Sequence, residues 1–166
     1  NYVSFLLQTN YSTSMYNSFM NWSESYIMKL PIKTYAALLE FRGIEIRDWG
    51  WLNNELVFPG TQNATYVVVI SNHYPYNIES VDASLYLPKG FSSKYGSIAK
   101  SYIPGPIGSN QETSLQFIVS IDDVKPGRYV AKLKLTYVID VGGSSMIKTD
   151  NLTVPIIVNK IERGVG

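Results

Sequence analysis

The chain has 166 residues, of which 45% are hydrophobic and only 16% are charged, and its formal net charge is +1. This length suits one domain with a short arm, and the balanced charge argues against a nucleic-acid binder, which would need a basic stripe. Because cysteine is absent and histidine occurs once, disulfides, thiol catalysis and multi-histidine metal sites are excluded. The aliphatic runs are far shorter than the roughly 20 residues that cross a bilayer, so we expect no membrane span.

The first 35 residues form an N-terminal arm whose pattern differs from the rest of the chain. Residues 1–8 predict a short strand in which Val3, Phe5 and Leu7 share one face. Residues 13–28 carry apolar side chains at intervals of three and four, which predicts a short helix. Neither element can bury its apolar face alone, so each needs another surface to pack against.

Residues 36–160 predict an all-β fold, an immunoglobulin-like antiparallel β-sandwich of seven or eight strands, followed by a tail over 161–166. Short alternating segments recur there between clusters of glycine, proline and asparagine. A first strand over 36–46 changes phase at Gly43, which predicts a bulge. A second over 64–72 holds the run Val67 to Ile70, which predicts a central strand covered on both faces.

The later strands follow from alternation and from turn residues. Segments 78–87, 98–103, 129–139 and 146–159 are expected strands, as is the segment that carries Leu115, Phe117, Val119 and Ile121. Gly142 and Gly143 sit where a hairpin should turn. Pro155 limits the last strand to an edge or a bulge, since proline cannot donate to a sheet ladder.

The sequence offers no catalytic constellation, so we expect neither an enzyme nor a cofactor. His73 lies in a turn-like context with no nucleophile-elbow motif near any serine. Asp122 and Asp123 are adjacent carboxylates before a turn. They are weak candidates for a calcium site, and solvating the turn explains them better.

Two aromatic features leave structural and functional interpretations open. Trp49 and Trp51 flank a glycine, so they could stack on sugar rings, or one could pack over the end of the sandwich while the other stiffens a loop. Tyr129 opens a strand after a Pro-Gly turn. Its hydroxyl is expected to bond upstream backbone, as in a tyrosine corner.

Four Asn-x-Ser/Thr sequons make N-linked glycans the expected partners of this chain, at Asn10, Asn21, Asn63 and Asn151. Amide and hydroxyl groups replace charge over much of the expected surface. Together these features favour an extracellular protein at the cell surface.

Residues 36–160 resemble the immunoglobulin-like domains of archaeal surface-layer and other cell-envelope proteins. The resemblance rests on the segments Pro59 to Thr65, Ile78 to Gly90 and Val124 to Tyr129. One sandwich with an N-terminal strand also resembles the subunits of archaeal extracellular thread-like filaments.

That resemblance implies a homopolymer built by donor-strand complementation, with Val3, Phe5 and Leu7 as the anchors of the donor. It further implies head-to-tail growth, glycosylation and isopeptide cross-links, although the sequence identifies no pair of a lysine with an asparagine or aspartate for such a link. The alternatives are a stalk or anchoring domain of a surface-layer protein, and a carbohydrate-binding or adhesive module that uses Trp49 and Trp51.

Overall fold

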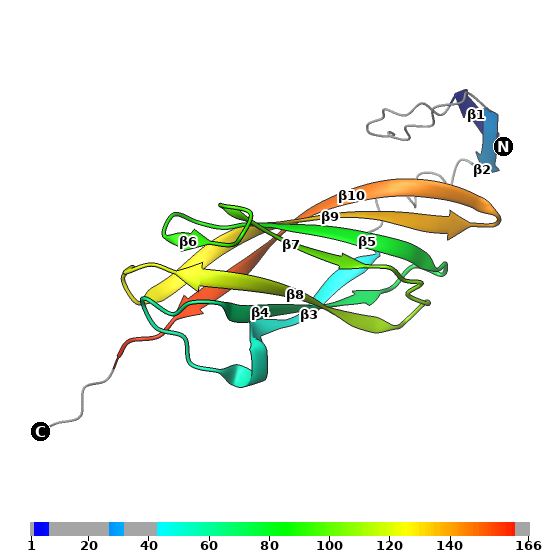
Figure 1. Cartoon of the computed structure of the whole chain (residues 1–166). Coiled ribbons are helices and arrows are strands. Elements are labelled where there is room, and N and C mark those ends of the chain that lie inside the picture. The colour runs from blue at the N-terminus through cyan, green and yellow to red at the C-terminus, as the bar shows by residue number, and fades with distance from the viewer. Residues whose placement is uncertain (1, 7–26, 32–42, 162–166) are drawn as a thin grey trace, which may run out of the picture.

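The computed structural model describes residues 2–6, 27–31 and 43–161 (Figure 1). In them the chain forms one 3-10 turn, η1 (Leu52–Asn54), and ten strands: β1 (Tyr2–Leu6), β2 (Ile27–Pro31), β3 (Ile44–Trp51), β4 (Ala64–Asn72), β5 (Ile78–Tyr86), β6 (Phe91–Ser92), β7 (Ile98–Ile103), β8 (Glu112–Ile121), β9 (Gly127–Val141) and β10 (Ser144–Val158). Within these ranges no helix has the length and apolar character needed to cross a bilayer.

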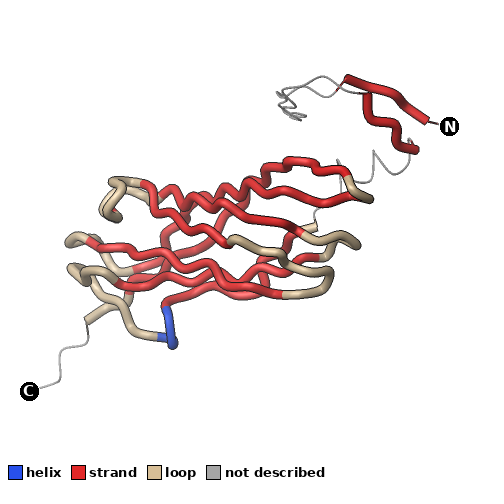
Figure 2. Tube along the Cα trace, turned by 45° about the vertical axis from the view of Figure 1, so that its right-hand side comes forward, coloured by secondary structure: helices blue, strands red, loops and turns tan. Residues whose placement is uncertain are grey.

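Eight strands, β3 to β10, build a sandwich of two antiparallel four-stranded sheets, as the sequence predicts (Figure 2). The strand orders are β3-β4-β8-β6 in one sheet and β10-β9-β5-β7 in the other. They correspond to the ABED and GFC sheets of immunoglobulin domains, with β7 added beside the C-like strand β5. The sandwich departs from the immunoglobulin strand order in one respect, because the short D-like strand β6 comes before β7 in the chain.

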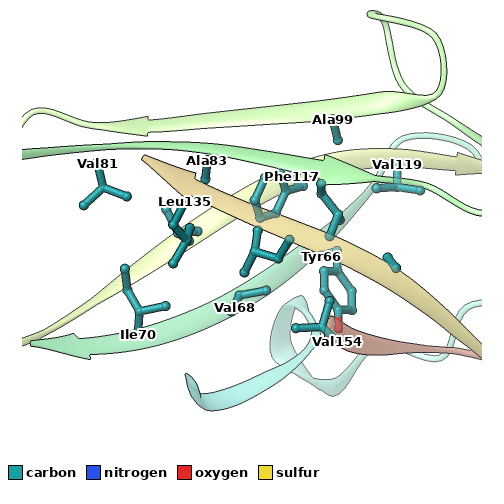
Figure 3. Packing of buried hydrophobic residues seen from close by; sticks show 14 of the residues in the cluster. Tyr66, Val68, Ile70, Val81, Ala83, Ala99, Phe117, Val119, Leu135 and Val154 are labelled. Carbon is teal, nitrogen blue, oxygen red and sulfur yellow. The ribbon is translucent and has the colours of Figure 1, made fainter. Parts of the chain in front are cut away.

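The core lies between the two sheets and is made by the alternate residues that face inward (Figure 3). Tyr66 and Val68 of β4 lie beside Phe117 of the neighbouring β8 and face Leu135 of the opposite sheet. All four side chains are fully buried. Burying each such side chain contributes about 1.5–3 kcal/mol. The strands predicted over 78–87 and 129–139 and in the segment from Leu115 to Ile121 are therefore confirmed.

Two predictions about the first sheet are wrong. β4 is central in its sheet, as predicted, but its outward residues Val67 and Val69 are only half-buried, because no second layer among the described residues covers that face. The bulge of β3 falls between Ile46 and Asp48 rather than at Gly43. Gly43 is required for a different reason, since a Cβ atom there would lie 2.2 Å from the ring of Tyr74.

The predicted turn chemistry is confirmed at the β9–β10 hairpin. Gly142 and Gly143 link the strands with φ values of 57° and 87°, which other residues rarely adopt. Pro155 lies in β10, an edge strand, as its missing N–H requires. Tyr129 donates a hydrogen bond of 2.5 Å to the carbonyl of Lys125 and so forms the expected tyrosine corner.

Asn72, which the sequence analysis did not single out, joins two loops at one end of the sandwich. Its side chain is buried and donates to the carbonyls of Tyr76, Ile107 and Gly108 at 2.9, 2.9 and 3.1 Å. Its Oδ1 accepts from the backbone N–H of Tyr74 at 2.9 Å. A fully satisfied buried amide specifies loop positions that apolar packing alone would leave loose.

The arm supplies a two-stranded sheet of its own. β1 pairs antiparallel with β2, from Tyr2 opposite Pro31 to Leu6 opposite Ile27. The helix expected over 13–28 is therefore wrong at its end, because Ile27 and Met28 belong to β2, where β1 satisfies their backbone groups. The rest of that segment, Leu7, and residues 32–42 at the expected start of the sandwich lie outside the described residues.

Candidate functional site

The candidate site is the seam where β3, an edge strand of one sheet, comes close to β10, an edge strand of the other sheet. Residues Ile44–Ile46 of β3 and Asn151–Thr153 of β10 line an open groove of about 470 Å³, which we call the β3–β10 seam. Each strand lies at the end of its sheet, with a sheet neighbour on one side only. An edge of this kind is a template for pairing with a further strand.

The other half of this boundary is closed by aromatic side chains. The Trp51 indole N–H donates to the Ile157 carbonyl at 2.8 Å, and the Tyr66 hydroxyl donates to the Pro155 carbonyl. The two rings meet edge to face, with centroids 5.4 Å apart. These contacts fix the C-terminal half of β10 against β3 and leave the groove as the open half.

Trp49 and Trp51 both line a small hollow of about 160 Å³ beside β3, but the two rings are not equally available to a sugar. Both lie in β3, not in a loop, and Trp51 is only 8% exposed with its N–H already bonded. Trp49 is 37% exposed, and the guanidinium of Arg128 lies 5.9 Å from its ring centroid. The packing interpretation therefore fits Trp51, while Trp49 stiffens the boundary between the sheets.

A buried polar network adjoins the seam. Lys148 and Asp150 point inward from β10, and Lys148 Nζ donates to Asp150 Oδ1 at 3.1 Å with side chains only 16% and 10% exposed. The Tyr137 hydroxyl donates to Asp150 Oδ2 at 2.7 Å and lies 3.0 Å from the Tyr74 hydroxyl. The sequence signal for this network was an opposite-charge pair two residues apart on an otherwise apolar face.

Burial sets the protonation of this network. It raises the pKa of Tyr137 well above its ordinary value and also raises the pKa of Tyr74. Burial alone would lower the pKa of Lys148, but the neighbouring Tyr74 and Asp150 outweigh it and the pKa is raised. The folded protein therefore holds these protons to a higher pH than the unfolded chain does.

We expect stability to be lost at alkaline pH. The contribution of groups with raised pKa values is fully present below their unfolded pKa values, about 10 for tyrosine and lysine, and disappears as the pH rises through the folded values. The urea midpoint should therefore fall above about pH 10, and less steeply in Tyr137→Phe. Tyr102→Phe, at an exposed position, is the control and should keep the original slope. An unchanged slope in Tyr137→Phe contradicts this account.

The remaining polar candidates have structural partners. His73 Nε2 lies 2.7 Å from Ser71 Oγ and 3.2 Å from Glu45 Oε1, so one nitrogen meets both groups, whereas a catalytic triad uses the two ring nitrogens separately. Asp122 and Asp123 are exposed, and the backbone carbonyl of Asp122 accepts from Gly60 and Val124. Across the described ranges, no three histidine or acidic side chains gather as metal ligands would.

The sequons and donor residues are placed in part. Asn63 and Asn151 are exposed on the sandwich, and Asn151 lies on the rim of the β3–β10 seam. Val3 and Phe5 stand in β1 opposite Leu30 and Met28. Asn10 and Asn21 lie outside the described residues.

Taken together, fold and seam define an immunoglobulin-like sandwich that is open along one boundary and carries a separate two-stranded sheet. No family model matches the chain, and no curated protein matches it significantly. A solution structure of an Arabidopsis thaliana protein aligns with 72% of this chain and 83% of its own, at 14% identity and a TM-score of 0.42. Two crystal structures of a GH20 exo β-N-acetylglucosaminidase from Vibrio harveyi each align with 74% of this chain at 16% identity and a TM-score of 0.38, and this chain spans 19% of the enzyme. Similarities this weak identify no function.

Proposed function

We propose that the chain is a structural subunit of an archaeal extracellular filament, in which the N-terminal strand of one copy completes the sandwich of the next. The observation that carries the proposal is the pairing of β1. Among the described strands β1 joins β2 alone, and the sandwich is built without either of them. The arm is thus a strand-forming segment with its own sheet edge to offer.

The β3–β10 seam is the acceptor that fits this donor best. A strand of five residues is about 17 Å long and can pair with either open edge there by β-augmentation. Val3 and Phe5 lie on one face of the strand, so both can enter the groove beside the half-buried Ile46 and Leu152. Donor and acceptor are different surfaces, and such head-to-tail contacts generate an open polymer.

The surface of the sandwich suits an extracellular setting. Asn63 and Asn151 are exposed, so both sequons are accessible to glycans. Only 16% of the residues are charged, and only three ion pairs occur among the described residues. The assignment to an archaeal envelope rests on the resemblance of residues 36–160.

Removing the donor should abolish assembly. Deletion of residues 1–8 and the substitution Phe5→Asp are both expected to leave monomers in sedimentation and electron microscopy, because an aspartate cannot enter an apolar groove without a large desolvation cost. Ser4→Asp is the matched control, since it adds the same charge to the opposite face of β1 and should still polymerise.

A complementation experiment tests the acceptor separately. Leu152→Lys should block the groove while keeping the donor, and its melting curve checks that the sandwich is folded. Neither this variant nor the deletion should polymerise alone, whereas their mixture should yield one-to-one dimers. Filaments formed by the deletion variant would falsify the donor assignment.

A further inference from the structure

The opposite boundary of the sandwich carries a second hollow with a different chemistry. It lies where β7 borders β8, two strands of different sheets joined by a hydrogen bond of 3.3 Å from the Gln116 backbone N–H to Ser101 Oγ (Figure 1). We call it the β7–β8 hollow. It has a volume of about 310 Å³, and its lining includes Lys94, Tyr95, Lys100, Asn63, Gln116 and Ile118. This volume lies in the range of small-molecule sites.

Two cations converge on one aromatic ring in this hollow. Lys94 Nζ and Lys100 Nζ lie 5.1 and 5.4 Å from the centroid of Tyr95, which is 53% exposed. The ring attracts both ammonium groups, which places two positive charges at the hollow. Among the described residues neither lysine forms an ion pair, so the positive charge of the hollow is not neutralised by the protein.

The rest of the lining combines amide groups with an apolar surface. The side chains of Asn63 and Gln116 are exposed, and the backbone N–H of Asn63 is held by Ser120 Oγ at 3.0 Å. Ile118 is 51% exposed and supplies an apolar surface between the polar groups. A ligand that matches this lining has hydroxyls for the amides, C–H groups for Ile118 and one negative charge for the lysines.

We propose that the β7–β8 hollow binds an acidic saccharide, with the carboxylate of a uronic-acid-type sugar between Lys94 and Lys100. The charge-assisted contacts supply much of the affinity, and the amides and Ile118 distinguish a sugar from a simple anion. Asn63 is a sequon asparagine on the rim of the hollow. The sugar can therefore come from a glycan on Asn63 of the same chain or from a separate polysaccharide. This inference does not depend on strand exchange.

Titration of the full chain with a glucuronate-containing oligosaccharide, followed by NMR shifts and calorimetry, tests the site. The titration uses the Thr65→Val variant. This substitution removes the sequon and keeps Asn63, which has a left-handed conformation with φ of 55°. Binding should be saturable and should weaken about tenfold for each of Lys94→Gln and Lys100→Gln, the loss expected for one charge-assisted bond. The control pair Lys132→Gln and Lys134→Gln, exposed on β9, should bind as before.

Three results would overturn the proposal: no binding by the Thr65→Val protein, unchanged binding after both lysine substitutions, or equal binding of sulfate or of a neutral oligosaccharide of the same length. The source of the sugar follows from the chain glycosylated at Asn63. If its own glycan fills the hollow, the added saccharide binds only to Thr65→Val, whereas an external ligand binds to both forms.

Discussion

Asp150→Ala should lower the free energy of unfolding by about 3 kcal/mol, because it leaves the inward-facing Lys148 charge without its carboxylate. The same change removes the acceptor of the Tyr137 hydroxyl, which is 2.7 Å from Asp150 Oδ2. For a chain of this length the melting temperature should fall by about 6–12 °C. Urea denaturation followed by circular dichroism measures the change.

The double variant Lys148→Met/Asp150→Leu is the matched control. It replaces both charges by apolar groups, so no buried charge is left unpaired, and stability should return to within about 1 kcal/mol of the original. The Tyr137 hydroxyl keeps its contact with the Tyr74 hydroxyl at 3.0 Å. If the single substitution costs less than about 0.5 kcal/mol, as ordinary surface changes do, the network has no part in stability.

Trp51→Ala should destabilise the sandwich by about 3–5 kcal/mol, the cost of removing a large buried aromatic side chain. The indole is 8% exposed, packs edge to face on Tyr66 and donates to the Ile157 carbonyl. Its loss opens the closed half of the boundary between β3 and β10. Amide hydrogen exchange should therefore accelerate in β10 before it does so in the central strands.

Trp49→Ala provides the comparison within the same strand. Trp49 is 37% exposed, and its defined partner is Arg128, so the expected cost is about 1 kcal/mol. Trp51→Phe separates the ring from its N–H and should cost about 1–3 kcal/mol through the unsatisfied Ile157 carbonyl. A cost for Trp49→Ala equal to that of Trp51→Ala would contradict the assignment of Trp51 as the residue that closes the boundary.

Local patterns in the sequence predict the sandwich strands well. The expected segments 64–72 and 98–103 coincide with β4 and β7, and the hairpin turns at Gly142–Gly143. Alternation works here because each strand has one face on the core, so a single period of two decides which residues are buried. The bulge predicted at Gly43 was wrong because the role of this glycine depends on Tyr74, a residue 31 positions away.

The candidate site could not be read from local pattern. Ile44 and Leu152 meet only because β3 and β10 end their respective sheets, which is a property of topology rather than of either segment. Lys148 and Asp150 share the apolar face of the alternating pattern, but their pairing with each other and with Tyr137 depends on the register of β10 and β9. The apolar pattern of residues 1–8 does predict a strand, but it cannot name β2 as the partner.

The pairing of β1 with β2 has a consequence for the subunit before it meets another copy. A lone apolar strand would expose hydrogen-bonding groups on both sides and would invite indiscriminate aggregation. The pairing with β2 satisfies one side of that strand within its own chain. In the assembly proposed above, the free side of β1 is the one that meets the next subunit, while β2 keeps the other side paired.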